Sequence, residues 1–460
     1  MFIFNLNKKD YKKIHFIGIG GVSMSGIALL LKRQGYEISG SDRNDSKYLK
    51  HLYENDIEIF IGQKASNISD QDLFVYTDAI LDDNEELIAA KNTGRPVVTR
   101  GEFLGALMRN YKRSIAISGS HGKSTSTSML SKILVDAKAD ASILLGGMLD
   151  EIDGNVLVGE SDILLTEACE FKGNILYYYP STVIILNIDE DHLDYYKDLN
   201  HIVETFIGYM KNLDEDSKAI INIDDKNTHR LLNHVKGQTI TFGMSKDADY
   251  VIDNLSFNED GFPRFDLVHD GKIMPLSLDI LGDYNIYNAA ASAIAALENG
   301  IDYQVIQKSL ASYHSLHRRL ETVGFHNGAE VITDYGHHPV EIKNTLNSLK
   351  KKKHNKIISV FQPHTYSRTK ALLDDFAEAF YDADEVVVTE IFAAREKFDP
   401  SIKSEDLVKK LIQNGVNAIY LETFDEASDY LKKRLKPDNI CITTGCGNPD
   451  VLAEMIADEE

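Results

Sequence analysis

The chain has 460 residues, which is enough for roughly three domains of ordinary size, and no apolar run approaches the roughly 18 residues of a membrane helix. Its formal net charge of −22 excludes a general nucleic-acid binder, although a local basic pocket can still bind small anions. The three cysteines, Cys169, Cys441 and Cys446, form no C-x-x-C pair, and the start lacks a secretory signal, so we predict a cytoplasmic protein.

The chain opens with a βαβ pattern. An apolar strand, Ile14–Ile17, leads into a glycine-rich turn, a helix-like run follows, and a second strand, Tyr36–Ser39, ends at Asp42. "LFVYTDAI" and "RPVVTR" are predicted as later strands of the same parallel sheet. The turn contains Gly18, Gly20 and Gly21.

This turn leaves several ligands open. The fingerprint G-x-G-x-x-G requires a third glycine at position 23, where the chain has Ser23. Asp42, about 22 residues after Gly20, suits a contact to a ribose hydroxyl. A nicotinamide cofactor, another nucleotide and a structural turn all fit. A triphosphate loop further along the chain favours a nucleotide-linked substrate.

The second part of the chain begins at about residue 112. It opens with this triphosphate loop, in "SIAISGSHGKSTSTSML" (residues 114–130). Its backbone N–H groups and the following helix N-terminus would bind phosphate, with Lys123 supplying charge and the Ser124 hydroxyl a ligand for Mg²⁺. The common loop G-x-x-x-x-G-K-[ST] would need glycine where Ile117 stands, so a capped turn is the alternative. The predicted phosphate-binding residues are Gly119, Ser120, His121, Gly122, Lys123, Ser124 and Thr125.

Acidic residues follow two buried strands of this part. Glu167 ends "DILLTE", and "NIDEDHLDYY" places Asp189, Asp191, His192 and Asp194 after the next strand. Carboxylates and an imidazole at strand ends beside a phosphate loop predict Mg²⁺ ligands. From about residue 238 to 281, short alternating runs predict an antiparallel patch, and a helix then ends at Gly300.

The last part of the chain, after about Arg319, resumes the alternation of strands and helices. Arg318 and Arg319 stand where an anion could be held, although such pairs are usually surface salt-bridge donors. Polar residues at strand ends mark the ligand-binding edge of an open parallel sheet. They are Asp334, Tyr335, His337 and His338 in "DYGHHP", and His364 and Arg368 in "FQPHTYSRT".

Together these motifs resemble the Mur ligase family, the ATP-dependent amide-forming enzymes of bacterial cell-wall synthesis. "GSHGKST" is similar to that family's shorter loop G-[TS]-x-G-K-[ST]-T, which accounts for the absence of glycine at position 117. "GIGGVSMSGIA", "NIDEDHLDYY", "RRLE", "DYGHHPVEI" and "FQPHTYSRT" follow the family's order from residue 14 to about 450.

The resemblance implies an α/β fold of three domains. They are a Rossmann-like domain for the UDP-substrate (residues 1–111), a P-loop ATPase domain with an added antiparallel patch (112–318), and a Rossmann-like domain for the amino acid (319–460). It also implies ligation of L-alanine to the lactyl carboxylate of UDP-N-acetylmuramate. ATP and Mg²⁺ are the implied cofactors, and an acyl phosphate the intermediate.

Roles for single residues also follow from the resemblance alone. Gly18, Gly20, Gly21 and Asp42 would bind the UDP part, and Ser124, Glu167 and His192 would hold Mg²⁺. ATP would also be contacted by residues outside the loop, namely Asn285, Asn288, Arg319 and Asp334. His338, His364 and Arg368 would face the amino acid and the muramyl group. Lys123, His192, Arg319 and His338 would be the catalytic residues.

The chain departs from the family pattern at several places. "EACEFK" replaces E-A-D-E-S-D, Tyr284 replaces a histidine, Thr365 an arginine, and "GCGNPD" the usual G-A-G-D. A sister ligase that adds another amino acid or a preformed peptide is therefore an alternative. Two others are a nicotinamide-dependent oxidoreductase built on Gly18–Gly26 and a non-catalytic nucleotide-binding regulator.

Overall fold

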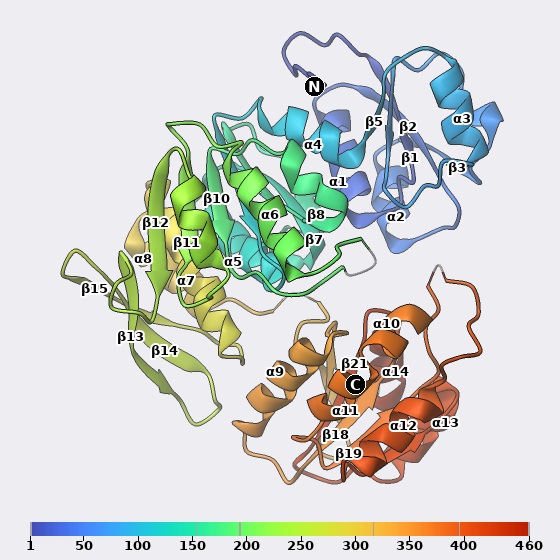
Figure 1. The fold of residues 1–460 in the computed structure, drawn as a ribbon, viewed down its shortest axis with the longest axis vertical. Coiled ribbons are helices and arrows are strands. Elements are labelled where there is room, and N and C mark those ends of the chain that lie inside the picture. Colours follow the sequence, from blue (N-terminus) through green and yellow to red (C-terminus); the bar gives the residue numbers. More distant parts are fainter. Residues whose placement is uncertain (1, 153, 193–194, 316, 395, 459–460) are drawn as a thin grey trace. The chain divides into compact units, whose positions relative to one another are not determined.

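The computed structural model describes residues 2–152, 154–192, 195–315, 317–394 and 396–458. Within these ranges the strands form three mainly parallel sheets flanked by helices (Figure 1), which confirms the predicted α/β class. The chain divides into two compact units, of which the first runs to Asn254 and adds Phe265–Leu276 and Tyr284–Tyr313. Every helix among these residues is too short or too polar to span a bilayer.

The first sheet is wholly parallel, in the order β3-β2-β1-β4-β5. Ile14 and Phe16 of β1 pack with α1 and α4, whereas Ile17 packs with α3 on the opposite face, so helices cover both sides. The strands are β1 (Lys13–Ile17), β2 (Glu37–Asp42), β3 (Glu58–Ile61), β4 (Leu73–Tyr76) and β5 (Val97–Thr99). The helices are α1 (Val22–Arg33), α2 (Lys47–Glu54), η1 (Ala65–Asn67), α3 (Glu85–Asn92) and α4 (Arg100–Met108).

The order of this sheet positions the glycine turn. Because β1 lies between β2 and β4, the turn that follows β1 is at the topological switch point, where open α/β sheets bind ligands. The strand β3 was not predicted, because "EIFI" is short and contributes only two half-buried side chains at the sheet edge.

The second sheet has the order β15-β14-β13-β12-β11-β10-β6-β9-β7-β8. The strands are β6 (Arg113–Ser118), β7 (Ser142–Leu149), β8 (Gly154–Leu157), β9 (Ile163–Glu167), β10 (Thr182–Ile185), β11 (Lys218–Asn222), β12 (Gln238–Gly243), β13 (Tyr250–Phe257), β14 (Pro263–His269) and β15 (Lys272–Ser277). The helical segments are α5 (Lys123–Asp136), η2 (Asp150–Ile152), η3 (Phe171–Tyr177), α6 (Leu199–Met210), η4 (Thr228–His234), α7 (Tyr284–Glu298) and α8 (Tyr303–Ala311).

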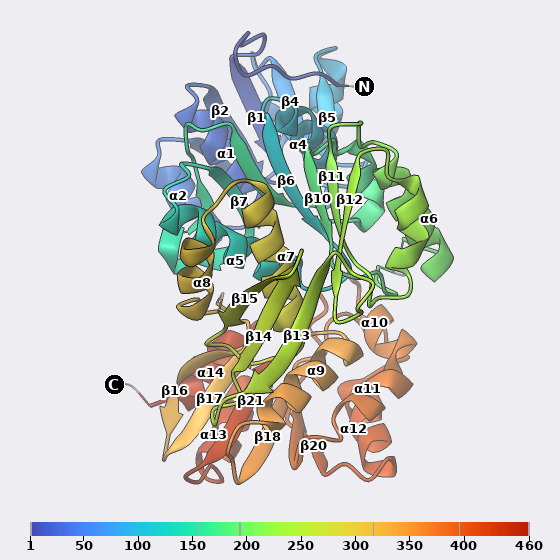
Figure 2. The same cartoon turned by 90° about the vertical axis from the view of Figure 1, so that its left-hand side faces the viewer.

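Two features of this sheet matter for the site. First, β6 lies between β9 and β10, so the loop after β6 is next to the ends of both neighbours. Second, β12 pairs in parallel with β11, so the predicted antiparallel patch begins one strand later than residue 238. The patch is the ribbon of β13, β14 and β15 (Figure 2), whose short connections exclude parallel crossovers.

The third sheet has the order β16-β17-β21-β18-β19-β20, with only the edge strand β16 antiparallel. Its strands are β16 (Glu321–His326), β17 (Ala329–Asp334), β18 (Lys356–Phe361), β19 (Glu385–Val388), β20 (Ala418–Tyr420) and β21 (Asn439–Thr444). The apolar residues of α9, α11 and α12 cover one face, and those of α13 and α14 the other. The helices are α9 (Pro339–Lys350), α10 (Tyr366–Ala371), α11 (Leu373–Ala379), α12 (Ser404–Gln413), α13 (Phe424–Lys432) and α14 (Pro449–Ile456).

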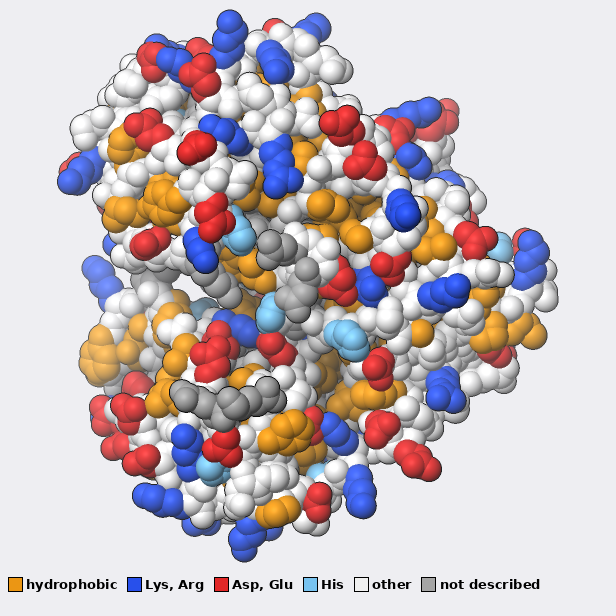
Figure 3. Space-filling model, turned by 180° about the vertical axis from the view of Figure 1, so that it is seen from behind, with side chains coloured by type: hydrophobic (Ala, Val, Ile, Leu, Met, Phe, Trp, Pro, Cys, Tyr) orange, Lys and Arg blue, Asp and Glu red, His pale blue; other side chains and the backbone are white. Residues whose placement is uncertain are grey.

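The charged side chains are spread over the surface. On the face drawn in Figure 3, acidic and basic groups are interspersed, with apolar side chains between them. Among the described residues, this face therefore carries no large patch of a single charge sign.

Candidate active site

The phosphate-type loop connects β6 to α5 in the first unit. Gly119 and Gly122 have positive φ angles of +143° and +86°, which favour glycine, and α5 begins directly after Gly122. A Cβ at position 122 would lie 2.4 Å from Asn288 Oδ1, so close packing also requires glycine there. The N-terminus of α5, which follows this turn directly, has the arrangement that suits anion binding.

Asn187, which the sequence interpretation missed, holds this loop in place. Its Oδ1 accepts from the His121 backbone N–H at 2.8 Å, and its Nδ2 donates to the His121 carbonyl at 3.0 Å. The Ser120 N–H also donates to the Asn187 carbonyl at 3.2 Å. Asn187 is a polar residue just beyond a buried strand adjacent to β6, and only the strand order reveals that adjacency.

Lys123 is paired with an acidic residue that was also missed. Its Nζ lies 3.1 Å from Oε2 of Glu170, whose side chain is only 2% exposed, and it donates to the Ser120 carbonyl at 3.2 Å. Burial by itself lowers the pKa of Lys123, but the negative charges around it, chiefly that of Glu170, bring the pKa above its ordinary value. Lys123 is therefore positively charged, and these contacts fix its side chain at the start of α5.

Ser124 and Glu167 lie together as predicted. Ser124 Oγ donates to Glu167 Oε2 at 3.1 Å, and the Gly146 N–H donates to the other carboxylate oxygen at 2.7 Å. Two adjacent ligands of octahedral Mg²⁺ at roughly 2.1 Å are roughly 3 Å apart. The spacing of these two oxygens thus fits a single bound Mg²⁺.

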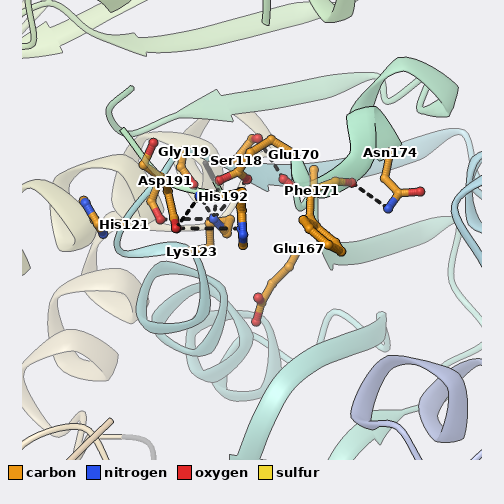
Figure 4. A network of polar contacts seen from close by, with 12 residues as sticks. Ser118, Gly119, His121, Lys123, Glu167, Glu170, Phe171, Asn174, Asp191 and His192 are labelled. Carbon is orange, nitrogen blue, oxygen red and sulfur yellow. Dashed lines mark hydrogen bonds and ion pairs between the residues drawn. The ribbon is translucent and has the colours of Figure 1, made fainter. Parts of the chain in front are cut away.

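A second group of possible metal ligands surrounds Lys123 (Figure 4). Glu170, Asp191 and His192 each offer a ligand atom, and these atoms lie within 4.8 Å of one another. The ring of Phe171 packs against that of His192 with centroids 4.9 Å apart. The predicted His192 therefore lies beside Glu170, whereas Asp194 is outside the described residues.

Cys169, one of the departures from the family pattern, is half-buried next to these groups. Burial and the negative charge of Glu170 raise the pKa of its thiol to about 11, so it is a neutral thiol at physiological pH. A neutral side chain here leaves Glu170 as the carboxylate nearest to Lys123 in this segment.

The two predicted adenine-binding asparagines lie behind the loop. Asn288 accepts from Ser126 Oγ at 3.1 Å and donates to Asn285 Oδ1 at 2.9 Å, and both side chains are buried. Asn288 thus contacts the helix that carries Lys123 and Ser124. This position couples α7 to the phosphate loop.

Asp42 lies against the glycine turn of the first sheet. The Gly20 N–H donates to Asp42 Oδ2 at 2.8 Å, and the Gly18 and Ile19 N–H groups donate to the Ser41 carbonyl at 2.8 and 2.9 Å. Gly21 occupies the N-cap position of α1, so the turn leads directly into a helix N-terminus. A glycine turn before a helix N-terminus with an acidic side chain beside it is the arrangement expected of a nucleotide-binding turn.

The missing third glycine of the fingerprint is explained by packing at position 26. A Cβ on Gly26 would lie 3.3 Å from Leu144 Cδ2 and 3.4 Å from Asn155 Nδ2, both in the β7–β8 region. Asn155 donates to the Val22 carbonyl at 2.6 Å. The close helix–strand approach thus occurs at Gly26, so Ser23 is tolerated.

In the second unit, Arg319 and Asp334 lie near one another. Burial raises the pKa of the Asp334 carboxyl, and the nearby Arg319 guanidinium opposes that shift. The Arg319 guanidinium also lies 5.2 Å from the ring centroid of Tyr335. Arg318 instead donates to the Gly445 and Gly447 carbonyls at 2.9 Å each. It therefore stabilises the position of the "GCGNPD" loop, residues 445–450.

Two of the three predicted amino-acid-site residues are in contact. Arg368 Nη1 lies 3.4 Å from His364 Nδ1, and the rings of His364 and His337 are 6.0 Å apart. His338 occupies the N-cap position of α9, where its backbone N–H donates to Glu341 Oε2 at 3.2 Å. These groups belong to the loops that follow β17 and β18, which are separated in the sheet only by β21.

Family models match most of the chain. The Mur ligase family, catalytic domain, matches residues 13–112, the Mur ligase middle domain matches 117–296, and the Mur ligase, glutamate ligase domain, matches 318–447. These matches confirm the three-domain family fold that the motifs implied.

Similar proteins share nearly the full length. The UDP-N-acetylmuramate--L-alanine ligase of Clostridium botulinum is 46% identical over 98% of both chains, and that of Alkaliphilus metalliredigens is 43% identical over all of both. The crystal structure of UDP-N-acetylmuramate-alanine ligase MurC from Thermotoga maritima matches with a TM-score of 0.81. It is 27% identical and covers 96% of this chain and 98% of its own. The chain therefore belongs to the Mur ligase family.

Proposed function

We propose that this chain joins L-alanine to the lactyl carboxylate of UDP-N-acetylmuramate, with conversion of ATP to ADP and phosphate, as a step in peptidoglycan precursor synthesis. The observation that carries the proposal is the full-length similarity, above 40% identity, to ligases named for these two substrates. The phosphate loop with its held lysine supplies the chemistry that such a ligase requires. The nicotinamide-dependent oxidoreductase alternative is not supported, since it leaves this loop without a role.

Each of the three domains would bind one substrate. Residues 1–111 bind the UDP-sugar, residues 112–318 bind ATP, and residues 319–460 bind the amino acid. Gly18, Gly20, Gly21 and Asp42 would contact the UDP part, which the proximity of Asp42 to the turn amides supports. Cytoplasmic location fits a chain whose three cysteines are free.

In the first step, an oxygen of the lactyl carboxylate attacks the γ-phosphorus of ATP, giving an acyl phosphate and ADP. Lys123 and the backbone N–H groups at the start of α5 would stabilise the charge on the transferring phosphoryl group. Mg²⁺ would be held by Ser124 and Glu167, with His192 contributing to a second ion, and would neutralise phosphate charge. The three N–H donors of the Lys123 ammonium group are shared among Glu170 and the Gly119 and Ser120 carbonyls, so phosphate would replace at least one of these partners.

In the second step, the neutral amine attacks the acyl carbon and phosphate leaves. Arg368 and His364, which lie side by side, would bind carboxylate groups of the amino acid or the muramyl part. His338 would contact the same substrates from the start of α9, while Arg319 and Asp334 would address the nucleotide. Asn285 and Asn288 would complete the ATP site from α7.

The decisive experiment is a phosphate-release assay with UDP-N-acetylmuramate, ATP and Mg²⁺ against a panel of amino acids and one tripeptide. The tripeptide is L-alanyl-gamma-D-glutamyl-meso-diaminopimelate, for which a structurally similar ligase from Neisseria is named. We expect release that depends on both UDP-sugar and L-alanine. Release with the tripeptide but not with L-alanine would support the sister-ligase alternative, which the departures at Thr365 and "GCGNPD" keep relevant. Release independent of both acceptor substrates would overturn the proposal.

Asp42→Ala should weaken binding of the UDP-substrate about tenfold while leaving ATP binding unchanged, because the carboxylate accepts from the Gly20 N–H of the glycine turn and from the Arg43 N–H, both in the first domain. Calorimetric titration with each ligand measures both affinities. Asp56→Ala, at an exposed turn of the same domain, is the control and should leave both affinities as in the wild type. An equal loss of ATP and UDP-substrate affinity in Asp42→Ala would show that this turn is not a dedicated UDP site.

A further inference from the structure

A buried carboxylate lies beneath the glycine turn of the first sheet. Glu86, in the first turn of α3, and His15, on β1, have fully buried side chains, with His15 Nε2 3.0 Å from Glu86 Oε1. The same oxygen accepts from Asn67 Nδ2 at 2.9 Å, and the other oxygen accepts from the Ser41 hydroxyl. Three donor groups from three different segments thus surround one carboxylate.

The first connection from Glu86 to the turn runs through Ser41. The Ser41 hydroxyl donates to Glu86, while the Ser41 carbonyl accepts from the Gly18 and Ile19 N–H groups at 2.8 and 2.9 Å. Because Ser41 precedes Asp42 in β2, its position also sets where the Asp42 carboxylate meets the Gly20 N–H.

The second connection runs through η1 and reaches Asp42 from the other side. Asn67 Nδ2 donates both to Glu86 Oε1 and to the Gly62 carbonyl, each at 2.9 Å. The Gly62 N–H in turn donates to the Asp42 carbonyl at 2.7 Å. Two separate paths from one carboxylate therefore hold the backbone of Asp42 in position.

Burying a carboxylate is costly unless several donors satisfy it, and an apolar residue at position 86 would fill the same space without that cost. A fully satisfied buried network is rigid, since each bond fixes the geometry of the next. Rigidity has a use here, because the turn sets where the N-terminus of α1 and Asp42 lie, and these would have to match a diphosphate and a ribose within about 0.5 Å.

We propose that Glu86 is a positioning residue for the UDP-substrate: through Ser41 and through Asn67 with Gly62, it sets the geometry of the Gly18–Gly21 turn and of Asp42. The proposal rests on the proposed function of the first domain. It assigns no contact between Glu86 and the substrate, only control of the groups that make contact.

The test uses the full chain with Ser41→Ala, Glu86→Gln and the double variant. Ser41→Ala removes the hydroxyl of the first path, and Glu86→Gln removes the negative charge and leaves a single acceptor oxygen for the donors of both paths. Each should raise the KM and the calorimetric Kd for UDP-N-acetylmuramate about three- to tenfold, with kcat and the KM for ATP unchanged. The double variant should be no worse than about the larger single effect, because the Ser41 hydroxyl acts through Glu86.

Asn110→Ala is the matched control, because its side chain anchors the N-terminal segment of the same domain, away from the turn. Asn110 Nδ2 donates to the Phe4 carbonyl at 2.9 Å, and its Oδ1 accepts from the Leu6 N–H at 2.9 Å. It should lower Tm as the test variants do, yet bind UDP-N-acetylmuramate as the wild type does.

If Ser41→Ala and Glu86→Gln lower Tm but keep wild-type affinity, the network is only structural and the proposal is overturned. A parallel loss in Asn110→Ala would also overturn it, since any destabilisation would then suffice. Failure of the proposed function would differ, because the wild-type protein itself would not bind UDP-N-acetylmuramate.

Discussion

Lys123→Ala is expected to abolish ligation, with a loss of about 1,000-fold in kcat and an intact fold. Lys123 carries the buried positive charge at the start of α5, and no other lysine stands in the loop between residues 118 and 124. The alanine variant also leaves the Glu170 carboxylate facing the incoming triphosphate without its partner. Phosphate release by the purified variant, with circular dichroism to verify the fold, measures the effect.

Lys132→Ala provides the control for this prediction. Lys132 lies on the same helix, where its Nζ is 3.2 Å from Asp136 Oδ2 and away from the loop. Its loss should leave kcat within about twofold of the wild type, in line with the small energies of such pairs. If Lys123→Ala retained more than a few per cent of activity, the assignment of the loop would be wrong.

Glu167→Ala is expected to lower kcat about 100-fold and to weaken binding of the divalent cation. The carboxylate lies 3.1 Å from the Ser124 hydroxyl, a spacing that fits two ligands of one Mg²⁺, and alanine leaves only the hydroxyl. Titration of Mn²⁺ in the presence of ATP, followed by electron paramagnetic resonance, reports cation binding independently of activity.

Glu190→Ala is the matched change, since Glu190 is an exposed carboxylate in the loop after β10 and its removal alters the local charge equally. Its cation affinity should remain that of the wild type. Unchanged Mn²⁺ binding by Glu167→Ala would contradict the assignment and would direct attention to Glu170, Asp191 and His192 instead.

Much of the fold could be predicted because its signals are local. Buried strands such as Ile14–Ile17 and "DILLTE" are continuous apolar runs, and the glycines that follow the first strand and β6 mark sharp turns into helices. Short or edge strands gave weaker signals. Neither β3 nor β16 was predicted, because each contributes few buried side chains and alternation is faint over four to six residues.

The candidate site was predicted unevenly for a similar reason. Lys123, Ser124 and Glu167 stand in recognisable motifs, and the structure brings Ser124 and Glu167 together. Glu170 and Asn187 were missed, since each is an ordinary polar residue in its own segment. Arg318 resembled an anion-binding group in sequence, but its guanidinium is bonded to the carbonyls of the "GCGNPD" loop.

By itself the sequence determined the α/β class, the position of both glycine turns and the family, because these depend on residue types at short, fixed spacings. Only the tertiary structure decided which polar side chains position those turns through hydrogen bonds. Asn187 reaches the phosphate loop because β10 lies beside β6, and Glu86 reaches the first turn from 44 residues beyond Asp42 because α3 packs under β1 and β2. Such contacts follow from strand order and helix packing, which no local spacing encodes.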